Sequence, residues 1–277
     1  MAQNYATKYQ SKIAERFSIG SVTNSAAGNE YSFVGAKTIV VQSVDVVELN
    51  NFQRNAASNR FGAVANLGNT KQELTMTQDK SFVFAIDAGD ASDTAIEMSA
   101  GKALRREIDE VVVPTLDKYR LAAWANGGTE YTISSALDPD SIYEEILLAG
   151  AEMTDALVPL TNRTIYVPTK NFVLLKQNTS FVGVESLGKE ILSKGALGMV
   201  DGAVVKSVPS SWLPEGVEFI IKYKGTTVDP VKLQNYYIRK DAQGFDGPVV
   251  EGRVYFDSFV LDTKKAGIVV GKISDEI

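Results

Sequence analysis

The sequence predicts an α+β fold in which one long helix lies between two groups of strands. β-branched residues are dense in Lys37-Thr38-Ile39-Val40-Val41 and again over residues 249–261, which is typical of strands. Between them, apolar residues recur every four or three positions along residues 92–125, as in an amphipathic helix. The polar stretch 48–80 is unusually long for a connection inside a compact domain.

The composition removes several classes of chemistry. The chain has 277 residues, 44% of them hydrophobic, which is enough for one large domain or two smaller ones. It contains no cysteine and no histidine. Disulfides, thiolate nucleophiles, most structural zinc sites and the commonest general base are therefore excluded.

Charge and hydropathy argue against a dedicated nucleic-acid or membrane protein. Twenty-eight basic and 34 acidic residues give a net charge of −6, and the basic residues are scattered. A strong DNA-binding protein usually has a basic stripe, so we expect at most loose contact with a polyanion. The first residues lack an apolar signal-peptide core, and no stretch approaches the roughly 18–20 apolar residues of a membrane span. We expect a soluble protein made in the cytoplasm, without a membrane partner.

Residues 1–30 are polar and small, although Tyr5, Tyr9, Ile13 and Phe17 recur at the spacing of a short helix. Residues 18–29 are typical of an extended arm with little to bury against its own domain. Two interpretations stay open, a disordered tail or an arm that lies on a neighbouring subunit.

The polar stretch 48–80 also has two interpretations. Alternation at Leu74 and Met76, and then at Phe82, Phe84 and Ile86, predicts strands around a long excursion. The excursion is either a surface insertion or a projecting β-arm that contacts another molecule.

The long helix should begin near Ser92 or Asp93 and end at Gly127-Gly128. It would reach on the order of 50 Å, and Pro114 inside it predicts a bend or a break. Its apolar stripe consists of Leu104, Ile108, Val112, Leu116 and Tyr119.

A second helix is predicted at 140–157, with a Ser141–Glu144 capping box and an apolar stripe of Ile142, Ile146, Met153 and Leu157. A third helix should begin at Thr169. Strands are predicted at 163–167, 203–208, 217–223, 236–239, 249–261 and 268–270.

No catalytic, cofactor-binding or metal-binding residue is predicted. The glycines from Gly183 to Gly202 do not fit a phosphate-binding loop. Asp87, Asp90 and Asp93 lie where a strand passes into a helix, where acidic residues stabilise turns and helix N-termini. A carboxylate-dependent hydrolase or lyase is kept as an alternative because other acidic pairs, such as Glu144-Glu145, are present.

Four phrases, in order, resemble the major capsid protein of tailed bacteriophages with the fold of phage Hong Kong 97. They are Ser11-Lys12-Ile13-Ala14-Glu15-Arg16-Phe17, Asp79-Lys80-Ser81-Phe82-Val83-Phe84-Ala85-Ile86-Asp87, Val200-Asp201-Gly202-Ala203-Val204-Val205 with Val208-Pro209, and Phe256-Asp257-Ser258-Phe259-Val260-Leu261 with Lys265-Ala266-Gly267-Ile268. The resemblance runs over most of the chain, and the order of the phrases carries more weight than any one of them.

The resemblance implies an N-terminal arm, an extended loop, a peripheral domain with the long helix as its spine, and an axial domain. The arm would be residues 1–30 and the extended loop residues 48–86. The peripheral domain would be residues 31–47 with 87–127 and 230–277, and the axial domain residues 128–229. It implies a structural virion protein that self-assembles as pentamers and hexamers into an icosahedral shell around phage double-stranded DNA. The implied partners are further copies of the chain, a portal protein, a separate scaffolding protein, decoration proteins and loosely contacted DNA.

Contacts between subunits are expected from the arm and the loop, and no cofactor is expected. Some members of the family crosslink a loop lysine to an asparagine of a neighbour, but no partner residue matches here, so crosslinking is not predicted. A bacterial nanocompartment shell protein is the nearest alternative, and a tail-tube protein is another. The expected contact residues are Tyr5, Phe17, Phe52, Arg54, Arg60, Phe61, Lys71 and Lys80.

Overall fold

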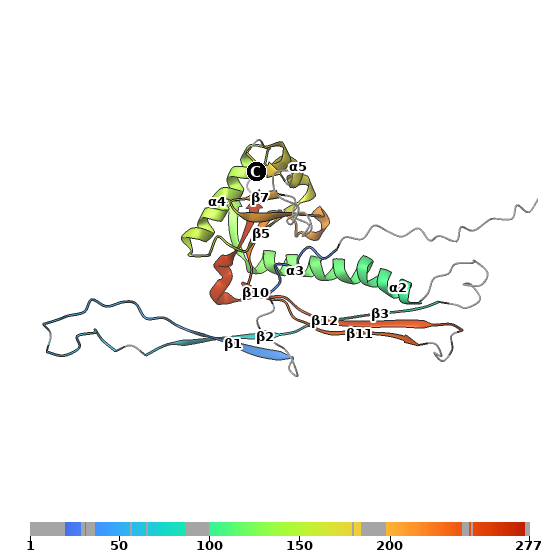
Figure 1. Ribbon diagram of the computed structural model, residues 1–277, viewed down its shortest axis with the longest axis horizontal. Coiled ribbons are helices and arrows are strands. Elements are labelled where there is room, and N and C mark those ends of the chain that lie inside the picture. The colour runs from blue at the N-terminus through green and yellow to red at the C-terminus, as the bar shows by residue number, and fades with distance from the viewer. Residues whose placement is uncertain are drawn as a thin grey trace, which may run out of the picture.

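The computed structural model describes residues 20–28, 31, 37–55, 57–64, 66–86, 100–178, 180–183, 198–239, 244 and 246–274. A compact lobe lies on one side of a long helix, and a three-stranded sheet lies on the other side (Figure 1). A narrow hairpin projects away from the junction of these parts. Among the described residues, no helix has the length and apolarity needed to cross a bilayer.

A mixed seven-stranded sheet forms the core of the lobe. Its order is β4-β14-β9-β5-β8-β7-β6, in which β14 is parallel to β4, β5 is parallel to β8, and the other pairs are antiparallel. The strands are β4 Thr129–Ile133, β5 Arg163–Pro168, β6 Val182–Gly183, β7 Gly198–Val200, β8 Ala203–Val208, β9 Val217–Tyr223 and β14 Ile268–Ile273.

Helices cover both faces of this sheet, which explains why its central strands are almost continuously apolar. Phe219 and Ile221 of β9 pack with α4 (Ser141–Asp155) and α5 (Thr169–Gln177). Ile220, between them, points to the other face and packs with Leu121 and Trp124. Alternation along one strand therefore supplies two separate cores.

The spine helix consists of α2 (Ala100–Glu107), the π-helical turn η1 (Ile108–Val112) and α3 (Val113–Gly127). Pro114 lies at the start of α3 and has no N–H to donate to the preceding turn. The structure accommodates it with the wider turn just before it, where the N–H of Val113 bonds to the carbonyl of Ile108. A bend or a break was expected at Pro114; the structure instead has a π turn just before it, and the helix continues through without a break.

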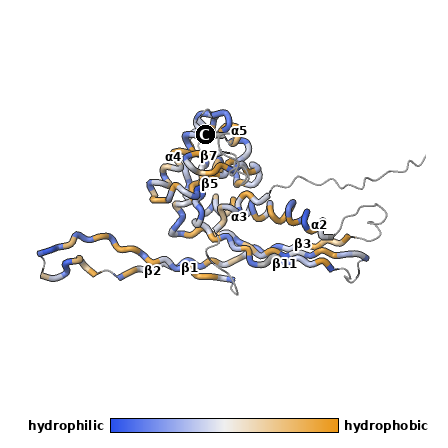
Figure 2. The backbone as a smooth tube through the Cα atoms, viewed as in Figure 1, coloured by the Kyte–Doolittle hydropathy of each residue, from blue (hydrophilic) through white to orange (hydrophobic). Residues whose placement is uncertain are grey.

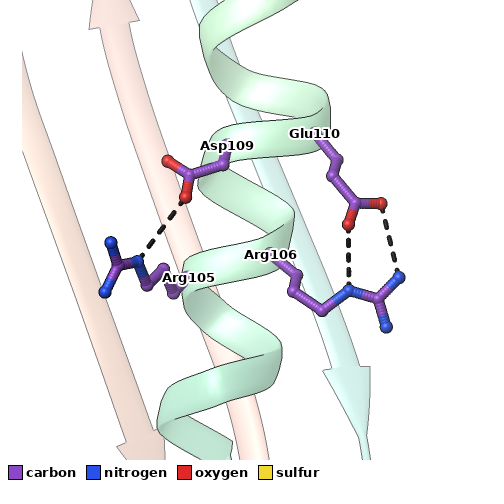
Figure 3. A network of polar contacts seen from close by, with 4 residues as sticks. All are labelled: Arg105, Arg106, Asp109 and Glu110. Carbon is purple, nitrogen blue, oxygen red and sulfur yellow. Dashed lines mark hydrogen bonds and ion pairs between the residues drawn. The ribbon is translucent and has the colours of Figure 1, made fainter. Parts of the chain in front are cut away.

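Two ion pairs span the joint between α2 and the π turn (Figure 3). Arg106 Nε donates to Glu110 Oε1 at 2.9 Å, and Arg105 Nε lies 3.6 Å from Asp109 Oδ2. Both are spaced four residues apart, so each links one helical turn to the next. The Arg106–Glu110 pair is the less exposed of the two.

A three-stranded antiparallel sheet of order β11-β12-β3 lies against the spine helix. Val254 and Phe256 of β12 pack with Leu116 of α3, and Tyr119 meets Phe256 edge-to-face with centroids 5.4 Å apart. Gly252 pairs with both Phe82 and Tyr236, whose rings stack across it at 6.1 Å. The strands are β3 Gln78–Ala85, β11 Val231–Arg239 and β12 Val249–Phe256.

Two small strand pairs complete the fold. β10 (Thr227–Val228) pairs with β13 (Phe259–Val260) beside the end of the spine helix. β1 (Thr38–Val44) pairs with β2 (Asn69–Thr75) in a hairpin that no third strand joins among the described residues. The short helices η3 (Ser210–Trp212) and η4 (Asp262–Gly267) are 3₁₀ turns.

Several local expectations are corrected. Residues 20–28 were expected to bury little on their own subunit, yet Thr23, Ala26 and Ala27 are buried in it. The capping box at Ser141 is wrong, because Asp138 Oδ1 accepts the N–H groups of Asp140 and Ser141 instead. Leu157, expected in the apolar stripe of its helix, follows the helix end with positive φ and is 91% exposed.

Two strands pair differently from the division into domains that the sequence predicts. β3 lies in the 48–86 loop of that division but pairs with β12. β14 lies in the peripheral 230–277 segment but pairs with β4 and β9 of the lobe. The start of the long helix at Ser92 or Asp93 lies outside the described residues, as do Asp87 and Asp90.

Gly252→Ala should destabilise the subunit by about 1–3 kcal/mol, because an added Cβ would overlap the Phe82 ring and lie 2.9 Å from Tyr236 Cδ1. Gly150→Ala in α4 is the matched control, since its Cβ would meet nothing within 4 Å and helical alanine is favoured over glycine. Urea unfolding of both variants measures the difference. Equal stability of the two would contradict this account of the sheet.

Candidate inter-subunit contact surface

The base of the β1–β2 hairpin is fixed to its own subunit. Leu74 and Met76 are fully buried in a cluster with Val228 and Leu261, and Ile39 packs against that cluster. Asp257 accepts the N–H and the hydroxyl of Thr77 at 2.7 and 3.0 Å. The chain therefore enters and leaves the hairpin at a rigid point.

The side-chain amide of Gln72 bonds to the neighbouring backbone as the main chain of an adjacent strand would. Its Nε2 donates to the carbonyl of Val260 at 2.9 Å, and its Oε1 accepts the N–H of Asp262 at 3.1 Å. Gln42, on the partner strand, is exposed and makes only a 3.4 Å contact with Asn69. Gln72 therefore fixes the direction of the hairpin more strongly than any other polar side chain on β1 or β2.

Beyond Val44 and Asn69 the chain continues as a long open loop whose described residues, except Gly62, are all exposed. The far end turns back on itself, where the N–H of Gln53 donates to the carbonyl of Arg60 at 3.0 Å. Phe52 and Phe61 meet edge-to-face there, with ring centroids 5.1 Å apart. We call residues 45–68 the hairpin tip.

The hairpin and its tip carry much of the exposed apolar surface of the subunit. Of the 18 exposed large hydrophobic residues in the described ranges, nine lie between Val40 and Leu67. Figure 2 shows apolar positions scattered along the whole projecting segment. Scattered exposed apolar residues are ordinary on protein surfaces, but half of them here gather on one projecting segment, which makes that segment the candidate contact surface. These nine are Val40, Val44, Val46, Val47, Leu49, Phe52, Phe61, Val64 and Leu67.

The projecting segment from Thr38 to Thr75 has no net charge, because Asp45, Glu48 and Glu73 balance its three basic residues, which all lie within residues 49–72. Residues 49–72 contain Arg54, Arg60 and Lys71 but no acidic residue. The net charge of the chain is −6 and this stretch contributes +3, so the remainder carries −9. Residues 49–72 are therefore locally basic on a chain that is acidic overall.

The structure places five of the eight expected contact residues together on the hairpin and its tip: Phe52, Arg54, Arg60, Phe61 and Lys71. Lys80 lies elsewhere, on β3 opposite Val254 and beside the π turn of the spine helix. Tyr5 and Phe17 lie outside the described residues. None of the eight has been tested as a contact, so all remain predictions.

Sequence reasoning missed the aliphatic residues of the tip. Leu49 and Val64 are more than 90% exposed, yet Leu49 lies between Glu48 and Asn50 and Val64 lies between two alanines, so neither belongs to a helical or a strand period. Val46 is equally exposed, although its sequence neighbours Val44 and Val47 are typical of a strand. The sequence did contain one signal, namely large aliphatic residues in a long polar loop that offers them no core to enter.

The described residues show no arrangement typical of acid–base or metal chemistry. Their acidic side chains form no group of three that could hold a metal ion. A hollow of about 490 Å³ on the outer face of the three-stranded sheet is lined by Val83, Tyr237 and Arg253. Beside it, Arg253 Nη2 binds Asp79 at 2.5 Å, and this hydrogen bond lowers the pKa of Asp79 below its usual range. A carboxylate that is exposed and already paired with an arginine has a structural role at the surface.

No protein-family model matches the chain, and no curated protein is detectably similar to it in sequence. Solved structures match nearly its full length. A chain of Mycobacterium phage Che8 superposes with a TM-score of 0.77 at 19% identity, covering 98% of both chains. The mature capsid of bacteriophage PhiM1 gives 0.75 at 11% identity, covering 99% of this chain and 93% of the other. The chain therefore has the fold of tailed-phage capsid proteins.

A virus-like particle from Pyrococcus furiosus resembles the chain less closely. Its TM-score is 0.54 at 11% identity, over 86% of each chain. The fold is thus shared by particles of more than one kind, and the phage capsids match it over more of its length.

Gln72→Ala should lower the free energy of unfolding by about 1–2 kcal/mol, because two hydrogen bonds to backbone groups are lost. Gln42→Ala is the matched control and should change it by less than about 0.5 kcal/mol, since that side chain is exposed. Urea unfolding followed by circular dichroism gives both values. A cost for Gln42→Ala as large as that for Gln72→Ala would show that Gln72 does not hold the hairpin.

Proposed function

We propose that this chain is the major capsid protein of a tailed bacteriophage. It self-assembles as pentamers and hexamers into an icosahedral shell that encloses double-stranded DNA in the virion. The single observation that carries the proposal is that a chain with the fold of phage capsid proteins carries the hairpin tip, an exposed extension with many apolar residues.

The physical argument is that the hairpin is incomplete in one subunit. A two-stranded hairpin is marginally stable in water unless another layer covers it. Only the base of this one is covered, by the cluster around Leu74 and Val228. Obligate subunit interfaces commonly bury more than about 2,000 Å², and an extended segment supplies such area with few residues. A second copy provides the apolar cover.

The strand pairing refines the proposed division of labour. We place the extended loop at residues 38–75, because β1 and β2 pair only with each other among the described strands. β3 joins the peripheral domain with β11, β12 and the spine helix, and β14 joins the axial domain. The axial domain is the part proposed to pack around five-fold and six-fold centres, and residues 1–19 remain the proposed N-terminal arm.

The proposed partners follow from this role. They are a portal protein, a separate scaffolding protein that acts during assembly in the host cytoplasm, and decoration proteins on the finished shell. The net charge of −6 suits a lining that contacts packaged DNA only loosely.

A nanocompartment shell protein is the second candidate, favoured by the likeness to the Pyrococcus furiosus particle. It would enclose a protein cargo and not DNA. Neighbouring genes separate the two roles: a portal and a terminase support the phage capsid, whereas a cargo enzyme supports the nanocompartment.

Purified protein should form closed shells or ring-shaped capsomers, visible by negative-stain electron microscopy. A protein that stays monomeric under all assembly conditions, including with its scaffolding partner, would contradict the proposal.

Replacing residues 46–67 with Asn-Gly should leave a folded subunit that no longer builds stable shells. The N–H of Asp45 already bonds to the carbonyl of Gly68 at 3.1 Å, so a two-residue turn closes the gap. The excision must stop before Leu74 and Met76, which are buried in the subunit. Leu157→Ser, which removes an exposed aliphatic residue of the lobe, is the control for a general solubility effect. Shells of normal stability from the shortened chain would refute the role of the tip.

A further inference from the structure

Residues 20–28 lie between α3 and the seven-stranded sheet, far in sequence from everything that they contact. Ala26 packs in the core formed by Leu121, Trp124 and Ile220. The rest of the segment is held by polar groups, since it contributes mainly hydroxyls, backbone amides and small side chains. It therefore lies on the subunit as a bound peptide would.

Asp117 of α3 receives the first part of the segment. Its carboxylate accepts the hydroxyl of Ser21 at 2.9 Å, the N–H of Val22 at 2.8 Å and the hydroxyl of Thr23 at 2.5 Å. Arg120, one turn later, donates to the same Thr23 hydroxyl at 3.3 Å.

Two buried lysines of the sheet receive the middle part. Lys206 on β8 donates to the carbonyl of Val22 at 2.8 Å and to the hydroxyl of Ser25 at 2.7 Å. Lys222 on β9 is fully buried, donates to the carbonyl of Ala26 and lies 4.5 Å from the centre of the Trp124 ring.

Asp229 receives the last part. Its carboxylate accepts the N–H of Gly28 at 2.9 Å, and its own N–H donates to the carbonyl of Gly28 at the same distance. Trp124 and Ser258 donate to its other oxygen at 3.1 and 2.5 Å. Residue 28 must be glycine, because a Cβ there would overlap the carbonyl of Thr227.

Five buried charged side chains thus converge on eight residues of the same chain. Burying a charge is costly unless it is paired and hydrogen-bonded, and the segment supplies partners to all five. We propose that Asp117, Arg120, Lys206, Lys222 and Asp229 form a reversible binding site for residues 21–28, which closes with release of a proton. We call it the latch site.

The proton comes from Lys222. Burial lowers its pKa to about 8; the charge of Asp229 opposes this, and those of Arg120 and Lys224 add to it. When the segment leaves, the ammonium reaches water and its pKa returns toward 10.5. The closed state then binds fewer protons than the open state, so closure becomes more favourable as the pH rises from about 8 to about 10.5. Burial also lowers the pKa of Lys206, which acts in the same direction.

The latch site determines where the preceding residues leave the subunit. Closure fixes residue 21 against α3, and opening gives the chain before it a longer reach. Apolar burial in the segment comes from Ala26, Ala27 and the partly buried Val22, so the segment can leave without removing a large side chain from the core. This proposal does not depend on the assembly role, because the latch site lies within one subunit.

A single engineered cysteine tests the latch in the full-length chain, which has no cysteine of its own. Ala27→Cys places a thiol in the closed segment, and Ser58→Cys places one in the exposed tip as the reference. The labelling rate of the first relative to the second should fall about tenfold between pH 7 and pH 9. Lys222→Met should remove most of this pH dependence.

Urea distinguishes the latch from global unfolding. The relative labelling rate of Ala27→Cys should change little with urea below the unfolding transition, because local opening exposes little surface. A rate with the full urea dependence of unfolding, or one without any pH dependence, would overturn the proposal.

Trp124 gives a second readout if Ala27→Cys itself opens the segment. In Trp212→Phe, Trp124 is the remaining tryptophan, and quenching of its fluorescence by acrylamide should decrease from pH 7 to pH 9. Unchanged quenching would also overturn the proposal.

Discussion

Helix α3 is the element on which both halves of the molecule depend, because its two ends belong to different cores. Leu116 and Tyr119 pack on the three-stranded sheet, while Leu121 and Trp124 pack on the seven-stranded sheet. Asp257 ties the same helix to the base of the hairpin, since it accepts both the Tyr119 hydroxyl and the N–H of Thr77. A shift of this helix would therefore move the lobe, the outer sheet and the hairpin together.

The sequence predicted the elements whose signal is local. The strands at 163–167, 203–208 and 217–223 and the helix from Thr169 are found as expected, because their periodicity and flanking residues act over a few positions. The class of fold was also predicted, because it rests on the order of several elements and short sequence similarities, no one of which is decisive alone. Five of the expected contact residues share the hairpin because the polar excursion was itself visible in the sequence.

Features that depend on distant partners were not predictable in this way. Residues 20–28 look like a free arm because nothing in their composition reveals that Asp117 and Asp229 need them, across 94 to 201 positions. The pairing of β14 with β4 joins two short strands at opposite ends of the lobe sequence. The capping box at Ser141 failed because Asp138, three residues earlier, supplies the oxygen that accepts the N–H groups of Asp140 and Ser141, and the sequence alone does not distinguish the two residues for this role.

In the proposed shell the hairpin tip would be received by a different part of the neighbouring copy, so the contact would be heterologous. Such a contact closes into a ring when the rotation from one copy to the next divides a full circle, about 60° for six copies and about 72° for five. Gln72 and Leu74 fix the projection at its base, and the remainder is exposed. The projection can follow either rotation by bending beyond its base. In the proposed shell one sequence would then serve two ring sizes, and the placement of the two kinds of ring would set the curvature of the whole particle.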